Sequence, residues 1–112
     1  MQQLLISDAN ILIDMEEGGL LEVMFQLPYD FATPDILFFE ELEEEHTHLL
    51  GLGLALKEVS SASMMYAMQL TGTYTQASRN DCFALALAKQ EQCPLLTGDM
   101  ALRKAAEKEA AI

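Results

Sequence analysis

The sequence predicts an α/β fold, a three-layer α/β/α sandwich with a parallel sheet in the middle. Short apolar segments with strand-forming residues alternate along the chain with longer segments of helical composition, which is typical of parallel sheets covered by helices. The strongest helical segment follows Ser78 and contains seven consecutive apolar residues at 82–88, which indicates a helix covered on most sides. A chain of 112 residues has the length of one domain, so residues 1–112 are expected to form a single domain.

The first strand is predicted at residues 2–8, where the apolar segment LLIS is closed by Asp8. Asn10 is a suitable N-cap for the helix that begins at Ile11. The glycine pair at 18–19 should interrupt this helix, and an apolar helical segment then continues to the first proline. The start of the chain is therefore expected to be a strand followed by two helices.

The second strand is predicted at residues 30–33, and Pro34 then suits the start of a long helix with the sequence PDILFFEELEEEHTHLL. The acidic run of this helix is expected to be mostly a solvated face. Because His46 and His48 lie two positions apart on one helix, their side chains cannot share a ligand face. Both histidines are therefore interpreted as ordinary surface residues.

The third strand is predicted at residues 54–59, and either Ser60 or Ser61 can cap a following helix that runs to Leu70. The methionines of this helix are interpreted as adaptable core residues. They are Met64, Met65 and Met68. A polar loop is expected to follow this helix.

The buried helix begins with a capping signal, because Ser78 is a good N-cap and Asp81 follows three positions later. There the carboxylate faces free backbone N–H groups and the positive end of the helix dipole, which favours its ionised form. Residues 92–97 are predicted to form the fourth strand, Gly98 allows a turn, and residues 100–110 are predicted to form the last helix.

Composition limits the partners and the location of the chain. Eighteen acidic against six basic residues give a net charge of −12, which argues against a broad nucleic-acid surface. No apolar run is long enough for a membrane span, and the N-terminus lacks the pattern of a secretory signal, so a cytoplasmic location is expected. Cys82 and Cys93 lie in or beside apolar runs without companion metal-ligand spacing and are interpreted as free thiols.

Four acidic residues from separate segments are predicted to converge at one edge of the sheet. They are Asp8, Glu40, Asp81 and Asp99. In such a fold the carboxyl ends of the strands and the N-termini of the following helices share an edge, and these acids are expected at strand ends or in early helical turns. Crowded carboxylates raise one another's pKa unless a cation neutralises them, and hard oxygen ligands suit Mg²⁺ or Mn²⁺. Such a site favours hydrolysis of phosphodiester bonds.

Four acid-containing segments stand in order along the chain: SDANILID at 7–14, PDILFFEEL at 34–42, SRNDCFALALA at 78–88 and LLTGDMALRKAA at 95–106. In this order and spacing they resemble the motifs of PIN domains, specifically the small VapC-like toxins of bacterial toxin–antitoxin pairs. The resemblance implies a metal-dependent endoribonuclease whose Mg²⁺ or Mn²⁺ ligands would be Asp8, Glu40, Asp81 and Asp99. It also implies supporting roles for Asn10 and Thr97 and an antitoxin protein that masks the site.

The position of the second acid is open between two neighbours. Counting from Pro34 favours Glu40, but Glu41 precedes Leu42, as the glutamate of the family often precedes a leucine. Adjacent residues on a helix point about 100° apart, so only one of the two can face inward. Glu40 is the preferred ligand and Glu41 the supporting alternative.

Three basic residues are candidates for contacts with RNA phosphates. They are Arg79, Arg103 and Lys104. The resemblance also implies a fifth strand after the helix at 100–110, but the sequence stops at Ile112, so a truncated chain that lacks its last edge strand is expected. An unpaired sheet edge would favour association of two copies as a homodimer.

Two other functions are considered. A PIN-type module for binding or regulation, with little nuclease activity, is suggested by the net charge of −12 and the expected loss of an edge strand. A Rossmann-like nucleotide binder is disfavoured, because the segment SDANIL after the first strand contains no glycine.

Overall fold

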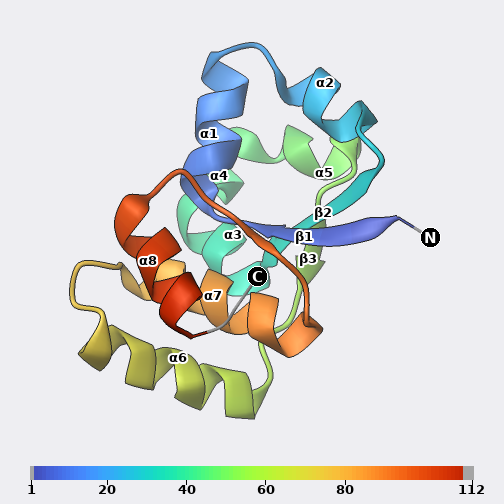
Figure 1. The fold of residues 1–112 in the computed structure, drawn as a ribbon. Coiled ribbons are helices and arrows are strands. Elements are labelled where there is room, and N and C mark those ends of the chain that lie inside the picture. The colour runs from blue at the N-terminus through green and yellow to red at the C-terminus, as the bar shows by residue number, and fades with distance from the viewer. Residues whose placement is uncertain (1, 110–112) are drawn as a thin grey trace.

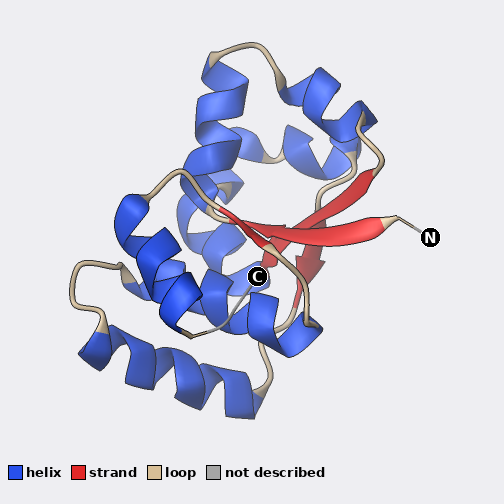
Figure 2. Ribbon diagram, in the orientation of Figure 1, coloured by secondary structure: helices blue, strands red, loops and turns tan. Residues whose placement is uncertain are grey.

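The computed structural model describes residues 2–109 and confirms the predicted α/β class. The sheet has four strands, all parallel. Helices surround it, as Figure 1 and Figure 2 show. In chain order the elements are β1 (Gln3–Ser7), α1 (Ala9–Glu17), α2 (Leu21–Gln26), β2 (Tyr29–Pro34), α3 (Asp35–Glu41), α4 (Glu43–His46), α5 (His48–Leu52), β3 (Ala55–Lys57), α6 (Ser61–Thr73), α7 (Arg79–Glu91), β4 (Leu95–Leu96) and α8 (Met100–Lys108).

The strands lie in the order β3-β2-β1-β4. The chain builds outward from β1 through β2 to β3, and then adds β4 on the opposite side of β1, where Leu95 and Leu96 pair with Ile6 and Ser7. The strand order therefore reverses between β1 and β4. In open α/β sheets, ligands bind in the crevice beyond the carboxyl ends of the strands at such a reversal.

Helices cover both faces of the sheet. Helices α1 and α2 lie on one side, and α7 lies on the other with α6 and α8 packed outside it (Figure 1). Residues 82–88 of α7 are all buried, which confirms the helix expected to be covered on most sides. Two clusters of apolar side chains form the core, and residues of α7 belong to both of them. The thiols of Cys82 and Cys93 are buried and free, as predicted.

The prediction of one long helix from Pro34 is wrong, because this segment forms the three short helices α3, α4 and α5. The breaks fall at Leu42, which is fully buried, and at Thr47. A continuous helix would place the glutamates of residues 40–45 three and four positions apart, and like charges at these spacings destabilise a helix. The acidic run therefore interrupts the helix, and helix α4 has no buried residue.

The prediction that all three methionines of α6 fill the core is also wrong. Met64 is partly buried against the core, but Met65 and Met68 are 68% and 49% exposed. Helix α6 packs on α7 as an outer layer, so it buries only a narrow stripe that includes Ala67 and Leu70. Its N-cap is Ser60, one of the two serines expected there.

The expected absence of a fifth strand concerns the chain after Glu109 and lies outside the described residues. Within residues 2–109, no helix combines the length and the apolar character needed to cross a membrane. The two longest helices of this range, α6 and α7, have 13 residues each.

Candidate active site

Asp8 lies where strand β1 ends and helix α1 begins, beside the reversal of strand order. Its side chain is fully buried, and its Oδ1 accepts a hydrogen bond of 2.9 Å from the backbone N–H of Ile11. The hydroxyl of Thr97 donates a hydrogen bond to its Oδ2. Asp8 is thus the N-cap of α1, so the assignment of this cap to Asn10 is wrong. The helix starts directly after the strand, which leaves Asn10 exposed in its first turn.

The loop after β4 brings Thr97 and Asp99 to the same place. The Thr97 hydroxyl, which donates to Asp8, also accepts a hydrogen bond of 3.0 Å from the backbone N–H of Asp99. Asp99 is the N-cap of α8, and its Oδ1 accepts a hydrogen bond of 2.8 Å from the backbone N–H of Ala101. Thr97 therefore joins the ends of β1 and β4, a position that suits the supporting role expected for it.

Asp81 lies in the first turn of α7, where a capping box fixes it. The backbone N–H of Asp81 donates to Ser78 Oγ at 3.0 Å, and the backbone N–H of Ser78 donates to Asp81 Oδ2 at 3.1 Å. The predicted capping box is confirmed. Helix α7 packs against β1, and its first turn lies close enough to Asp8 for the charge of Asp81 to act on that carboxyl group.

The pKa of Asp8 reflects this crowded position. Burial raises the pKa, and the hydrogen bonds from Thr97 and Ile11 lower it. The negative charges of Asp81 and Asp99 raise it further. The carboxyl group of Asp8 thus lies near two other negative charges. A bound cation would stabilise its ionised form.

Glu40 forms an ion pair with Arg79. Glu40 and Glu41 lie in the last turn of the seven-residue helix α3, so the prediction of an early turn is wrong. Arg79 Nη2 lies 2.5 Å from Glu40 Oε1 and 2.6 Å from Glu40 Oε2. Hydrogen bonding from Arg79 lowers the pKa of this exposed carboxyl group. Glu40 is therefore paired with a base on the surface.

Glu41 faces the acidic cluster. Asn80 Nδ2 donates a hydrogen bond of 3.1 Å to Glu41 Oε2, which turns the side chain toward the start of α7. Loss of contact with water raises the pKa of Glu41, and the hydrogen bond from Asn80 lowers it. The charges of Asp81, Glu40 and Asp8 raise the pKa further. The geometry thus favours Glu41 over Glu40, the reverse of the preference drawn from the sequence. Adjacent helical residues point about 100° apart, so a small difference in helix phase decides between them.

The candidate RNA-binding bases lie on α7 and α8, the helices whose N-terminal ends carry Asp81 and Asp99. Arg79 pairs with Glu40, and its guanidinium carbon lies 5.9 Å from the ring centroid of Phe83. Arg103 pairs with Glu107 on the exposed side of α8, with 3.4 Å between Nε and Oε1. Lys104 is exposed and helps to line a surface hollow of about 240 Å³ between α8 and the loop before α7.

The structure brings together the ends of β1, β4, α3 and α7 and so assembles acids from four segments. They are Asp8, Glu41, Asp81 and Asp99. Their donor atoms are carboxylate oxygens, the ligands that hard divalent cations prefer. Among residues 2–109 no three of these acids bring ligand atoms within 4.8 Å of one another, a spacing that suits carboxylates repelling each other.

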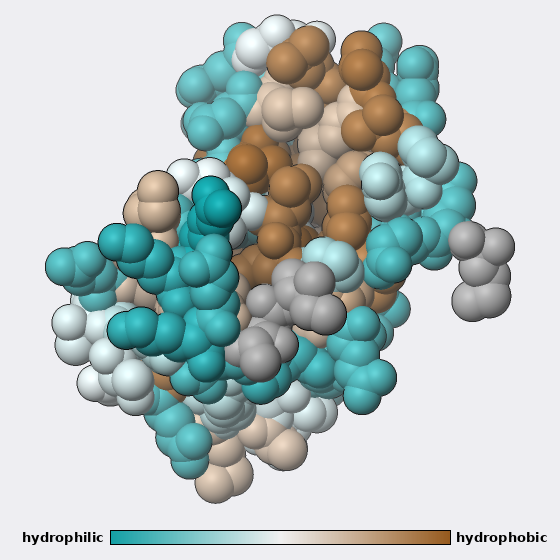
Figure 3. Space-filling view, in the orientation of Figure 1, coloured by the Kyte–Doolittle hydropathy of each residue, from teal (hydrophilic) through white to brown (hydrophobic). Residues whose placement is uncertain are grey.

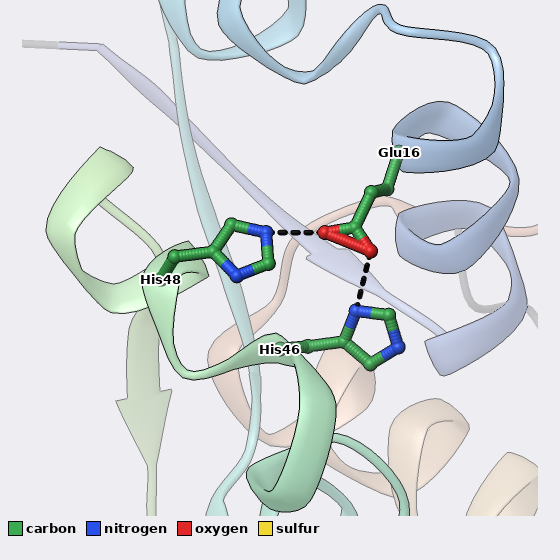
Figure 4. A group of neighbouring side chains, drawn as sticks. All are labelled: Glu16, His46 and His48. Carbon is green, nitrogen blue, oxygen red and sulfur yellow. Dashed lines mark ion pairs between the residues drawn. The ribbon is translucent and has the colours of Figure 1, made fainter.

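A different group of side chains does come that close, and the sequence pattern does not predict it. His46 Nδ1 lies 2.8 Å from Glu16 Oε2, and His48 Nε2 pairs with Glu16 Oε1 (Figure 4). The prediction that these two side chains cannot share a ligand face is therefore wrong, although His48 is exposed as expected. It assumed one helix, whereas Thr47 separates two. The acidic run before the histidines could have indicated the break, because its like charges lie three and four positions apart on a continuous helix and destabilise it.

Comparison of the sequence with models of known protein families and with curated proteins gives no match.

Proposed function

We propose that this protein is a metal-dependent endoribonuclease that hydrolyses RNA phosphodiester bonds and resembles PIN-domain toxins of the VapC type. The observation that carries the proposal is that Glu41, Asp81 and Asp99 lie around the buried Asp8 at the carboxyl ends of β1 and β4. The raised pKa values of Asp8 and Glu41 agree with this arrangement, since the charges of other acids in the cluster raise each of them in part.

The donor set fits Mg²⁺ or Mn²⁺, because carboxylate oxygens are hard ligands and the site is rich in negative charge. When bound, the cation would supply polarisation of a phosphoryl oxygen and a water molecule of lowered pKa. Cation charge would also offset the repulsion between RNA and a chain with a net charge of −12.

The chain itself supplies positioning. Thr97 and the backbone of Ile11 hold the Asp8 carboxylate, and backbone N–H groups at two helix N-termini hold Asp81 and Asp99. Ligands that are fixed by such hydrogen bonds need little reordering when a cation binds. Phosphates of the RNA would approach over the surrounding bases, for which the candidates remain Arg79, Arg103 and Lys104.

A protein partner is part of the proposal: a cognate antitoxin in the cytoplasm that covers the site. An apolar hollow of about 370 Å³ lies over β1 and between α1 and α2, and Figure 3 shows its brown lining. Its lining includes Ile11, one turn of α1 after Asp8. An antitoxin segment with apolar side chains and basic flanks would suit this hollow and the negative charge around it.

We also expect the chain to form a homodimer. Sedimentation of the chain alone measures its oligomeric state.

Cleavage of total RNA with and without Mn²⁺ tests the proposed activity. Asp99→Asn should reduce the metal-dependent rate by at least about 100-fold, because it removes a charged ligand from the site. Asp14→Asn removes the same charge from an exposed position of α1 and should leave the rate unchanged. Cleavage that needs no metal, or that survives Asp99→Asn, would contradict the proposal.

A binding or regulatory module with little nuclease activity is the second candidate function. The observation that favours it is the pairing of Arg79 with Glu40, which neutralises the base beside the acidic site. Calorimetric titration with Mn²⁺ separates the two candidates. Binding that is lost in Asp8→Asn supports the nuclease, whereas a lack of binding by the unmodified chain supports the module.

A further inference from the structure

Outside the acidic site, one glutamate and two histidines from three helices meet, as Figure 4 shows. Glu16 lies in the last turn of α1, His46 ends α4 and His48 begins α5. One ligand atom from each residue lies within 4.8 Å of the other two. Both histidines contact the same carboxylate, one through Nδ1 and the other through Nε2.

The break in the helix at Thr47 produces this arrangement. On a continuous helix, two positions correspond to a rotation of about 200°, so the two imidazoles would point in nearly opposite directions. Because α4 ends before Thr47 and α5 begins after it, both rings turn toward α1, with 6.2 Å between their centroids.

His46 supplies a second observation. Its side chain is only 12% exposed, and its Nδ1 makes no aligned hydrogen bond within the described part of the chain, although Glu16 Oε2 lies 2.8 Å away. A buried ring nitrogen without an aligned partner is costly unless a ligand satisfies it. A surface hollow of about 360 Å³, lined in part by Glu16, Glu22 and His48, leaves space for water beside two of the three donors.

We propose that Glu16, His46 and His48 bind one transition-metal ion, for which Zn²⁺ is the best match. Two imidazole nitrogens and one carboxylate oxygen form a donor set of zinc sites that keep a fourth position for water. Imidazole ligands disfavour Mg²⁺ and Ca²⁺, which prefer oxygen. This site is separate from the acidic one, since Glu16 follows Asp8 by eight residues, or about 12 Å along α1.

The competing explanation is an ion-pair clamp without metal, in which the histidines only tie α4 and α5 to α1. The two explanations differ in stoichiometric metal binding. Calorimetric titration of the full chain with ZnCl₂, in buffer with excess Mg²⁺ to occupy oxygen-ligand sites, should give one Zn²⁺ per chain. The absence of Zn²⁺ binding would overturn the proposal in favour of the clamp.

Substitutions locate the ion. Glu16→Gln and His48→Gln should each weaken Zn²⁺ binding by at least about 100-fold. His48 is half exposed, with 52% of its side chain accessible, so its replacement should leave the fold intact, as circular dichroism can verify. The matched control is Glu17→Gln, which removes the same charge at the next, exposed position of α1 and should bind Zn²⁺ as the unmodified chain does. Unchanged binding by Glu16→Gln and His48→Gln would overturn the proposal.

Two further measurements exclude other ligands. Asp99→Asn should retain Zn²⁺ binding, and loss of binding in this variant would place the ion in the acidic site instead. With Co²⁺ in place of Zn²⁺, the absorption spectrum should lack a thiolate charge-transfer band. Such a band would assign the ion to Cys82 or Cys93 and overturn the proposal.

Discussion

The side chain of Asp8 is fully buried, accepts two hydrogen bonds and lies near two other acids. Its pKa is raised mainly because the folded protein removes water from the carboxyl group. In the unfolded chain the same group returns to its ordinary pKa. The protonated form of Asp8 therefore suits the metal-free fold better than the ionised form does.

The sign of the pH dependence follows from this difference. A group whose pKa is raised by folding contributes stability below its unfolded pKa and loses that contribution as pH rises through the folded pKa. Metal-free Asp8→Asn should therefore be more stable than the unmodified chain at pH 7, and the difference should shrink as the pH is lowered toward 4. Urea unfolding in EDTA at both pH values measures it. A variant that is less stable at pH 7 would show that ionised Asp8 is stabilising.

At the residue scale, the sequence located most of the acidic cluster. Asp8, Asp81 and Asp99 could be placed because each follows a strand or a capping residue, and such positions are set by local patterns. Glu41 could not be chosen over Glu40, because that choice depends on how α3 rotates against α7. Thr97 gave no strong local signal, since its hydrogen bond joins residues 89 positions apart.

At the scale of elements, helix α7 owes its start to the capping box of Ser78 and Asp81. Because α7 contacts β1, β2 and β4 as well as α6 and α8, the stability of its first turn contributes to the stability of the whole fold. Asp81 would also lose one of the hydrogen bonds that orient it if the cap were removed.

Ser78→Ala should lower the free energy of unfolding by about 1 kcal/mol, since it removes the oxygen that accepts the Asp81 N–H. Ser61→Ala, at an exposed position in the first turn of α6, is the matched control and should change stability by less than about 0.5 kcal/mol. Chemical denaturation of both variants measures the difference. Equal stabilities would show that the capping box contributes nothing.

Strands and helices that are marked by apolar patterns, caps or turn residues were predicted well. The segment whose helix is broken by charge repulsion was not. The four strands and the helices α1, α2, α6, α7 and α8 lie close to their expected positions. The prediction of a single helix after Pro34 is wrong, because the apolar spacing favours one helix whereas the repulsion among five glutamates opposes it. That error also concealed the two histidines, whose meeting with Glu16 requires the break at Thr47.

At the scale of the whole molecule, the net charge of −12 opposes compaction. The pattern of alternating strands and helices predicted the parallel sheet, but it could not give the strand order. The placement of β4 beside β1 depends on contacts between residues far apart in the sequence. Surface ion pairs such as Arg103 with Glu107 offset little of the repulsion, because exposed pairs contribute only about 0–1 kcal/mol.

Salt should therefore stabilise the metal-free protein. Raising NaCl from about 10 mM to about 150 mM shortens the range of repulsion from about 30 Å to about 8 Å. We expect the Tm to rise by a few degrees in EDTA, and to rise less in a variant with Glu43, Glu44 and Glu45 replaced by Gln. A Tm that falls with salt would mean that specific ion pairs outweigh the general repulsion.

The burial of Cys82 within α7 also determines how the protein meets oxidants and alkylating reagents. Burial raises the pKa of this thiol to about 11, so only about one molecule in ten thousand carries the reactive thiolate at pH 7. Reagents can reach the sulfur only when α7 separates from its neighbours. The rate of thiol labelling in the native protein thus measures how often α7 separates from the rest of the fold. Residues of α7 belong to both apolar clusters of the core, so this rate also reports the opening of the core.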